Sequence, residues 1–523
     1  MGRVLMTADR RSVRERLVRP MPDDGIWGWL APLLVAGVAG VLRFWRLGTP
    51  KAFIFDETYY AKDAYALLQF GVEHDYISSS KEGAPDPANA KILAGDLQGI
   101  FTDSPSYVVH PPGGKWAIAS GEWLFGMNPF GWRFAVALAG TLAVLMLARI
   151  GRRLFRSTLL GCVAGLLLAV EGLAFVHSRA ALLDPLLMFW TLAAFGALLV
   201  DRDRTRERLA DTFDSVSSRL GPGLGLRPWR LTAGLCLGMA CATKWSGVWF
   251  LAVFGLMTVL WDWGARKSAG TRRPLLGTLL RDAAPAFASL VLVAAGVYLL
   301  SWTGWFLGGD DAYLRHWAED NPGSALVPDA LRSLWHYHSD AWSFHTDLDS
   351  YHPYRSSPWG WLVLARPVSY FYQGPKSGEM GCAVDQCSQA ITALGTPAIW
   401  WAGVLALLVV LYLWAARRDW RAGAILAGIA GGYLPWFLFQ DRTIFSFYAV
   451  AFVPYVVLAI TMCLGMVLGR ADASPARRQY GAAAAGAYVL LAIANFAYLL
   501  PVLSAQVIPY ADWAQRMWWR SWI

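Results

Sequence analysis

Long apolar stretches recur along the whole chain and are separated by shorter polar connections. Runs such as 27–41, 159–170, 251–261, 286–300 and 402–415 contain no charged residue. With their uncharged flanks most of them reach about 20 residues, the length that an α-helix needs to cross the hydrocarbon core of a bilayer. A single soluble core cannot accommodate so many runs of this kind. The pattern therefore predicts an all-α integral membrane protein.

About eleven membrane-crossing helices are predicted from these runs. They cover residues 27–46, 133–150, 159–176, 183–200, 230–243, 246–263, 283–302, 397–416, 420–438, 443–467 and 481–501. The stretch 230–263 is divided into two crossings because basic residues flank both of its ends, which places Lys244 at a turn on the outer side. An odd number of crossings puts the N-terminus in the cytoplasm and the segment 502–523 outside.

Two outer loops are long enough to carry function, namely 47–132 and 303–396. Within the first, residues 114–127 are apolar but too short to span, and we expect them to form a helix at the membrane surface. The loops and spans together make up one transmembrane domain, 26–501, preceded by a basic segment, 1–25.

Basic residues are distributed unevenly, and this distribution predicts the topology. The chain has 46 Lys and Arg against 37 Asp and Glu, a net charge of +9. Many of the cations lie in residues 1–25 and in alternate short loops, at 149–156, 202–230, 266–281, 417–421 and 470–478. Retention of positive loops in the cytoplasm explains this pattern for a multi-pass protein of the plasma membrane. A nucleic-acid partner is excluded because the cations form no single patch. A cleaved secretory signal is excluded because the first apolar run is one of many.

Two of the six cysteines lie in an outer loop. Cys382 and Cys387 occur in the segment CAVDQC, where an oxidising compartment favours a local disulfide. A metal-binding pair is the alternative, but no second Cys or His pair follows at zinc spacing.

Charged groups at the outer ends of the predicted spans are the strongest candidates for chemistry. Asp56 and Glu57 lie side by side after the first span, and cations occur where the positive-inside rule disfavours them. These cations are Arg43, Lys115, Arg133, Arg179 and Lys244. Each suggests an anionic partner, and guanidinium groups match phosphate oxygens in a bidentate way. The alternative is that Arg43 and Arg133 reach lipid headgroups or pair with Asp56 and Glu57.

Two further segments bring ionisable groups to the outer side. VEGLAFVHSRAALLDP carries Glu171, His177, Arg179 and Asp184, of which the last two could also form a structural ion pair. HPPGGK places His110 before two prolines that exclude helix. His110 either binds substrate or caps the helix that follows.

The motifs occur together in an order that resembles the protein O-mannosyltransferases, in particular their bacterial, actinobacterial type. These motifs are FDE after the first span, HPPxxKW, RF at 133–134, VE with SRxxLLDPLLMF, and ATKWSG at 242–247. The resemblance covers most of the membrane region.

The resemblance implies a GT-C glycosyltransferase fold and the transfer of mannose from polyprenyl-phosphate-mannose to Ser or Thr of exported proteins, with inversion. It implies Asp56 as the catalytic base and Glu57 as its partner, and Arg133 and Arg43 as phosphate ligands. The other matching positions, with substrate or phosphate binding as the implied role, are His110, Lys115, Glu171, Arg179, Asp184 and Lys244.

Transfer from a sugar phosphate needs a base that accepts the proton of the acceptor hydroxyl and cations that stabilise the leaving phosphate. It needs no acid to protonate the leaving group. We therefore expect no cofactor, although an Asp–Glu pair also suits a hard divalent metal. Acceptor proteins, membrane lipids and the Sec translocon are the expected partners. A transferase of the same fold that acts on a glycolipid or cell-wall glycan is the alternative function, and a lipid-linked sugar transporter is another.

Overall fold

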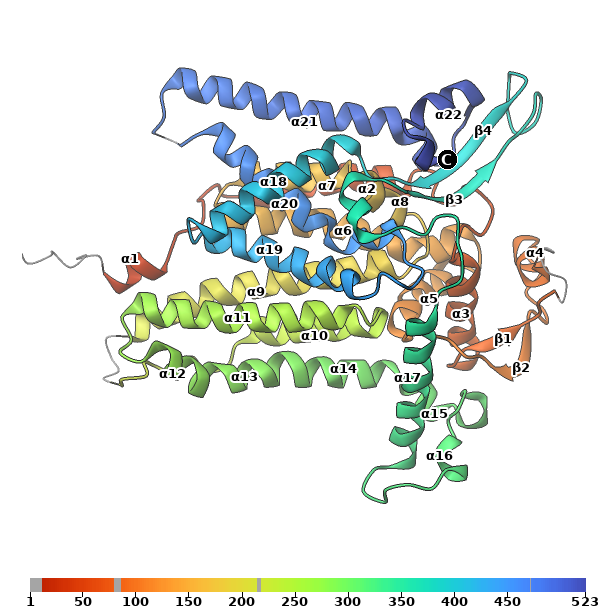
Figure 1. The fold of residues 1–523 in the computed structure, drawn as a ribbon, viewed down its shortest axis with the longest axis horizontal. Helices are drawn as coiled ribbons and strands as arrows, with labels where there is room; N and C mark the ends of the chain where they lie inside the picture. The colour runs from red at the N-terminus through yellow and green to blue at the C-terminus, as the bar shows by residue number, and fades with distance from the viewer. Residues whose placement is uncertain (1–11, 80–85, 214–217, 471) are drawn as a thin grey trace, which may run out of the picture.

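A computed structural model describes residues 12–79, 86–213, 218–470 and 472–523. Residues 1–11 of the predicted basic segment 1–25 lie outside these ranges. The long helices run alongside one another in a bundle, and Figure 1 shows α17 lying across one end of it while α1 lies at the other.

The first half of the chain is almost entirely helical. Its elements are α1 (Val13–Leu17), α2 (Trp27–Phe44), α3 (Glu57–Phe70), β1 (His74–Tyr76), α4 (Pro87–Leu93), β2 (Phe101–Pro105), α5 (Gly113–Phe125), α6 (Pro129–Phe155), α7 (Thr158–Ala169), α8 (Gly172–His177), α9 (Asp184–Thr212), α10 (Pro228–Thr243) and α11 (Gly247–Ala269).

The second half adds a small sheet at one end of the bundle. Its elements are α12 (Pro274–Thr278), α13 (Ala284–Phe287) and α14 (Val293–Ser301), joined by π-helical turns, then α15 (Thr303–Leu307), α16 (Trp317–Asp320), α17 (Asp329–Asp347), β3 (Val368–Gln373), β4 (Cys387–Ala393), α18 (Pro397–Ala415), α19 (Trp420–Gly432), α20 (Val453–Leu468), α21 (Pro475–Leu503), β5 (Val507–Pro509) and α22 (Tyr510–Arg516). Short 3₁₀ turns precede β3 and α20. The strands form an antiparallel sheet in the order β3-β4-β5, and β1 pairs with β2.

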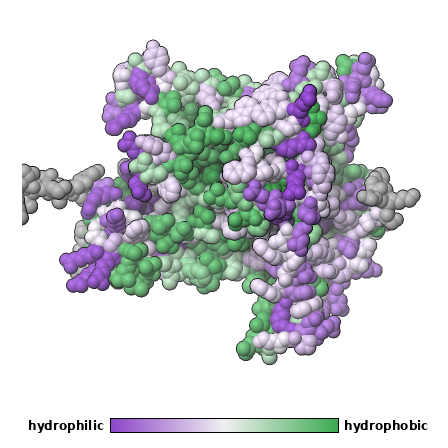
Figure 2. All heavy atoms as spheres, viewed as in Figure 1, coloured by the Kyte–Doolittle hydropathy of each residue, from purple (hydrophilic) through white to green (hydrophobic). Residues whose placement is uncertain are grey.

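Eight helices in the described ranges are long and apolar enough to cross a membrane. They are Trp27–Phe44, Pro129–Phe155, Asp184–Thr212, Gly247–Ala269, Pro274–Ser301, Pro397–Ala415, Ser446–Leu468 and Pro475–Leu503. The other three predicted crossings fall on shorter elements, α7 followed by α8, α10 and α19. The number of eleven membrane crossings therefore stays a prediction. Figure 2 shows an apolar band between two more polar ends, as a membrane-embedded bundle requires.

One predicted span is interrupted. The stretch 159–176 is not continuous, because α7 ends at Ala169 and α8 begins after Glu171. The Glu171 carboxylate accepts hydrogen bonds from the backbone N–H groups of Leu173 and Ala174, at 3.1 and 2.7 Å. The prediction of a single helix there was wrong because Glu171 starts a new one as its N-cap.

Small residues allow the central helices to approach closely. A β-carbon on Gly161 of α7 would collide with the backbone carbonyl of Ala148 on α6, so these two helices pack almost backbone to backbone. The deepest helices are α9 and α20, whereas α2, α18 and α21 expose most of their apolar side chains.

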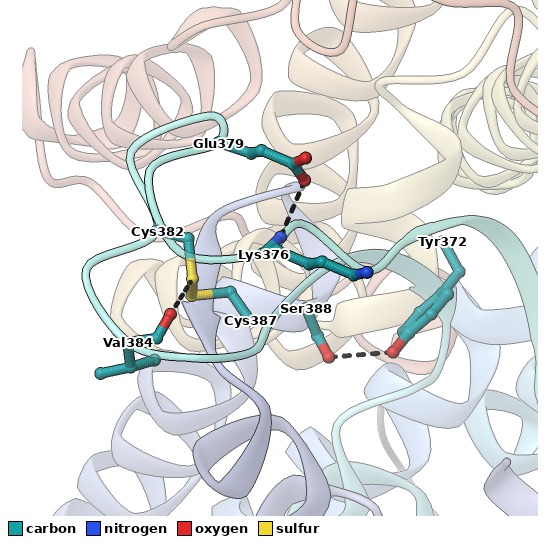
Figure 3. The surroundings of a disulfide bond; sticks show 7 residues. All are labelled: Tyr372, Lys376, Glu379, Cys382, Val384, Cys387 and Ser388. Carbon is teal, nitrogen blue, oxygen red and sulfur yellow. Dashed lines mark hydrogen bonds between the residues drawn. A yellow bond between two sulfur atoms is a disulfide. The ribbon is translucent and has the colours of Figure 1, made fainter.

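The predicted disulfide is present. Cys382 and Cys387 are bonded at the tip of the β3–β4 hairpin, which excludes the alternative of a metal-binding pair (Figure 3). The helix predicted at 114–127 is also present, as α5, with Trp123 and Leu124 exposed.

Candidate active site

A cavity of about 760 Å³ opens at the end of the bundle where α17 lies. Its volume falls within the ~300–1,000 Å³ that is usual for small-molecule sites. Four of the ten residues predicted for the site line it: Asp56, His110, Asp184 and Lys244. Arg442, which the sequence analysis did not single out, lines it as well. The remaining wall is mainly apolar and includes Leu251, Val291, Ala294, Leu299 and Trp342.

Asp56 lies at the start of α3, directly after a residue in a strained conformation. Phe55 has a positive φ of 50°, a left-handed backbone that costs a residue with a side chain about 1–2 kcal/mol. Its ring stacks on Tyr370 at 4.5 Å between centroids, and this packing offsets the strain. The strained turn fixes the direction in which Asp56 leaves the backbone.

The Asp56 carboxylate accepts no hydrogen bond from any residue in the described part of the chain. Burial raises its pKa to about 6, while the charge of Lys244 lowers that pKa and the charge of Asp184 raises it. A carboxylate with free lone pairs and a pKa near neutrality has the properties of a general base.

Lys244 and Asp184 form an ion pair in the cavity. The Lys244 ammonium lies 2.9 and 3.0 Å from the two carboxylate oxygens of Asp184, and 4.3 Å from the centre of the Tyr448 ring. The chain turns at Lys244 between α10 and α11, as predicted. Asp184 therefore pairs with Lys244, and the predicted alternative of an Arg179–Asp184 pair was wrong.

Three histidines contribute neutral polar groups to the cavity. The rings of His110 and His345 lie 5.1 Å apart, and burial lowers the pKa of His110 well below its ordinary value and that of His345 to about 4. His338 accepts or donates a hydrogen bond of 2.6 Å with the Tyr298 hydroxyl, to which the indole N–H of Trp245 donates at 2.9 Å. Neutral imidazoles can hydrogen-bond a substrate without adding charge.

Glu57 and Arg133 form a fully buried ion pair away from the cavity. The Arg133 guanidinium donates to both Glu57 oxygens, at 2.7 and 2.8 Å, and to the backbone carbonyls of Leu47, Pro50 and Ala52. Glu57 also accepts from two backbone N–H groups. These contacts saturate both groups, and neither residue lines the cavity, so the structure does not bring them together with Asp56.

Arg43 and Arg179 also hydrogen-bond to groups inside the protein. Arg179 donates to the carbonyls of residues 42, 43, 45 and 46, at the C-terminal end of α2. Arg43 is 1% exposed and donates to the carbonyls of Ala39, Leu168 and Ala169. Neither residue lines the cavity. Arg179 satisfies carbonyls at the end of α2, and Arg43 satisfies two at the end of α7, although its buried Nε has no partner among the described residues.

Lys115 and Glu171 complete the set of predicted residues that lie outside the cavity. Lys115 is buried between Glu73 and Asp63, the latter at 3.8 Å. Glu171 accepts from the Trp400 indole N–H at 2.8 Å in addition to capping α8. The structure therefore places both residues outside the cavity.

Arg442 is the cation that the sequence analysis missed. Among the described residues it forms no ion pair, and its buried Nε atom has no hydrogen-bond partner. Its positive charge lowers the pKa of both His110 and His345, which line the same cavity. The signal was available: residues 439–442 form a predicted outer loop, where a cation is as unexpected as at Lys244.

The adjacent acids Asp56 and Glu57 face different surroundings, because Asp56 lines the cavity whereas Glu57 binds Arg133 outside it. Across the described ranges no three His, Cys, Asp or Glu side chains come together in a way that could hold a metal ion. In the cavity the positive charges are supplied by Lys244 and Arg442.

Two family models together match nearly the whole chain. The model described as dolichyl-phosphate-mannose-protein mannosyltransferase matches residues 33–306, and that of the C-terminal four-transmembrane region of protein-O-mannosyltransferase matches residues 330–522.

Full-length relatives agree with these models. The chain is 41% identical to a polyprenol-phosphate-mannose--protein mannosyltransferase of Mycolicibacterium smegmatis, over 97% of this chain and 96% of the relative. It is 40% identical to the protein of the same name from Mycobacterium tuberculosis, over 96% of this chain and 93% of the relative.

A solved structure shares the fold. The S. cerevisiae protein O-mannosyltransferase complex bound to the sugar donor superposes with a TM-score of 0.71 at 14% identity, covering 96% of this chain and 93% of that one. This similarity confirms the GT-C membrane fold expected from the sequence. With the family models and the full-length relatives, it shows that the chain belongs to the protein O-mannosyltransferase family of membrane glycosyltransferases.

Proposed function

We propose that this protein transfers mannose from polyprenyl-phosphate-mannose to Ser and Thr hydroxyls of exported proteins. The observation that carries the proposal is that a carboxylate without a hydrogen-bond partner among the described residues, Asp56, and two cations, Lys244 and Arg442, line the same cavity. The first can accept a proton from a hydroxyl, and the others can stabilise a phosphate. The family membership and the names of the relatives support the same activity.

The reaction is a single displacement at the anomeric carbon. The acceptor oxygen attacks C1 of mannose while Asp56 takes the hydroxyl proton. The bond between C1 and the phosphate oxygen breaks, and its electron pair stays on the polyprenyl phosphate. Attack opposite the leaving group inverts the configuration. A phosphate is a good leaving group at neutral pH, so the step needs no protein acid.

The cations of the cavity are assigned to the phosphate. Arg442 has free N–H donors for a bidentate contact, and Lys244 adds a second charge that Asp184 holds in position. His110, kept neutral by burial, is assigned to a sugar hydroxyl or the acceptor. Glu57 and Arg133 are assigned to positioning, since they fasten the segment before Asp56 to α6.

The apolar wall of the cavity is assigned to the prenyl chain. It is lined by Val248 and Leu251 of α11 and by Val291, Ala295 and Leu299 of the helix Pro274–Ser301. We place the cavity on the outer face of the plasma membrane, with the N-terminus in the cytoplasm and acceptors arriving from the Sec translocon. We assign the transfer no metal, since Lys244 and Arg442 can provide the charge, and treatment with EDTA should leave turnover unchanged.

The test is a transfer assay with purified full-length protein in lipid nanodiscs, radiolabelled polyprenyl-phosphate-mannose and a Ser/Thr peptide. Asp56→Asn should reduce kcat at least about a hundredfold, the lower range for loss of a positioned base. Arg442→Gln should raise KM for the donor more than it lowers kcat. The matched controls are Asp103→Asn and Lys51→Gln, two exposed residues with no role in the cavity.

Several outcomes would contradict the proposal. Full activity of Asp56→Asn would contradict the assignment of Asp56 as the base. An unchanged KM for the donor in Arg442→Gln would contradict the assignment of Arg442 as a phosphate ligand. Labelling of a glycolipid or glycan but not of the peptide would favour the alternative acceptors. Movement of the intact donor across sealed membranes without transfer would favour a transporter.

A further inference from the structure

A second cavity, of about 190 Å³, lies at the opposite end of the bundle from Asp56. It is formed by the segment at the end of α1, the end of α6, the C-terminal third of α9 and the start of α19, elements that can be followed in Figure 1. Arg202 follows Asp184 by 18 residues on the same helix, or ~27 Å along its axis. The two cavities are therefore separate sites.

Arginine dominates the wall of this cavity. Its polar lining consists of Arg16, Arg19, Arg156, Arg202, Arg206 and Arg421, with Asp203 and Glu207 as the acids. Asp203 already binds Arg153 at 2.7 Å and Arg156 at 2.9 Å, and Glu207 lies 3.6 Å from Arg204. Asp419, next to the cavity, pairs with Arg421 at 2.6 Å. The local acids are thus shared among the surrounding arginines, and a net positive charge remains.

Two of these arginines are left without adequate partners. The Arg202 guanidinium lies 3.3 Å above the Trp420 ring, its contact with Asp203 is 3.5 Å, and its buried Nε has no hydrogen-bond partner. In the described part of the chain Arg206 forms neither an ion pair nor a side-chain hydrogen bond, and its Nε is buried too. Buried donors without acceptors cost free energy unless a ligand satisfies them.

We propose that this cavity binds a phosphate-bearing anion, held by Arg202 and Arg206 over the indole of Trp420. Guanidinium groups present paired N–H donors that match phosphate oxygens, and a phosphate would satisfy the unpartnered atoms. The volume, below the ~300 Å³ of typical ligand pockets, fits a headgroup or inorganic phosphate but not a lipid tail. The positive-inside rule accounts for arginines at this end, but it does not require them to converge on one cavity.

The test measures anion binding by the full-length protein in nanodiscs. Neutral phosphatidylcholine nanodiscs are compared with discs that contain phosphatidylglycerol, and native mass spectrometry counts the lipids retained. The variant Arg202→Gln/Arg206→Gln should retain one phosphatidylglycerol fewer and bind it about tenfold more weakly. Arg204→Gln is the matched control, because Arg204 lies on the same helix, is 69% exposed and does not line the cavity.

A second arm identifies the source of the phosphate. Inorganic phosphate is titrated into neutral nanodiscs, and the thermal midpoint of each variant is recorded. Retention of phosphatidylglycerol without stabilisation by phosphate supports a lipid headgroup, and stabilisation of the wild type but not of the double variant supports free phosphate. Equal binding of both probes by the wild type and the double variant overturns the proposal.

The single variant Arg206→Gln distinguishes loss of anion binding from loss of folding. Arg206 makes no polar bond within the described residues, so its loss should leave the thermal midpoint in phosphatidylcholine unchanged while weakening anion binding. Unaltered phosphatidylglycerol binding by this well-folded variant would also overturn the proposal. Mannose transfer by any of these variants is a separate readout, and the proposed function does not depend on it.

Discussion

Asp56 and Glu57 are neighbours in the sequence but have opposite environments. Glu57 is enclosed by four hydrogen bonds, two of them from Arg133, whereas Asp56 accepts none from the described residues and faces the cavity. The strained backbone of Phe55 directs the first acid outward, and the start of α3 directs the second inward. Reactivity and anchoring are thus divided between two adjacent carboxylates.

The raised pKa of Asp56 predicts the pH dependence of transfer. Below a pKa of about 6 the carboxyl is protonated and cannot accept the hydroxyl proton, so kcat/KM should fall as the pH falls. The decrease should approach tenfold per pH unit below that value, with a plateau above it. Initial rates measured in nanodiscs across this range provide the check. A flat profile down to about pH 5 would show that Asp56 does not act as the base.

Loss of the Glu57 charge should affect stability more than chemistry. Glu57→Gln would leave the Arg133 guanidinium buried without a counter-ion, which typically costs about 3–5 kcal/mol. SDS titration of the purified protein, followed by tryptophan fluorescence, should show a lower free energy of unfolding than in the Asp103→Asn control. A variant with wild-type stability and no turnover would instead assign Glu57 a direct catalytic role.

At the scale of helices and strands, cations at helix ends have two different functions. Arg179 satisfies the free carbonyls at the end of α2, while Lys244 and Arg442, in turns between helices, extend into the cavity. The sequence shows only that a cation stands at an outer helix end. Whether it meets a carbonyl, a carboxylate or a ligand depends on which helix packs beside it.

The disulfide should stabilise the tip of the β3–β4 hairpin. Its loop is short, so the chain-entropy gain is only about 2 kcal/mol. The replacement Cys382→Ser/Cys387→Ser should therefore leave transfer activity intact but accelerate tryptic cleavage after the exposed Lys376 several-fold. Mass spectrometry of timed digests measures this rate. Cleavage at the wild-type rate would show that the strands hold the tip without the bond.

At the scale of the whole molecule, the two ends of the bundle differ in chemistry. One end contains the large cavity with Asp56, and the other the small cavity with six arginines. The apolar band between them has the character of a membrane-spanning region (Figure 2). Basic segments at the second end predict that it faces the cytoplasm.

Cysteine labelling can test this orientation. A cysteine introduced at the exposed Lys51 should react with an impermeant maleimide on intact cells, whereas one at the exposed Arg417 should react only after permeabilisation. The four free native cysteines are at most partly exposed. The protein without an introduced cysteine therefore measures the background labelling. The reverse pattern would invert the topology and place the transfer reaction in the cytoplasm.

The membrane character and the family resemblance could be read from the sequence alone, as could four residues that line the large cavity: Asp56, His110, Asp184 and Lys244. Hydrophobic runs and the motifs around them are local, so they can be recognised without knowing which helices meet. It also indicated the disulfide, because Cys382 and Cys387 are close along the chain.

Which charged groups face a cavity, in contrast, follows from how the helices pack. Six residues look like site residues in the sequence, yet none of them lines the cavity, and each contacts partners from other elements: Arg43, Glu57, Lys115, Arg133, Glu171 and Arg179. Arg442 became a candidate because it lines the cavity, forms no ion pair among the described residues and has a buried Nε without an acceptor. Whether a buried cation finds acceptors depends in several of these cases on residues more than a hundred positions away in the sequence. Arg179, for example, donates to the backbone carbonyl of Arg43. Such contacts arise only when the helices assemble.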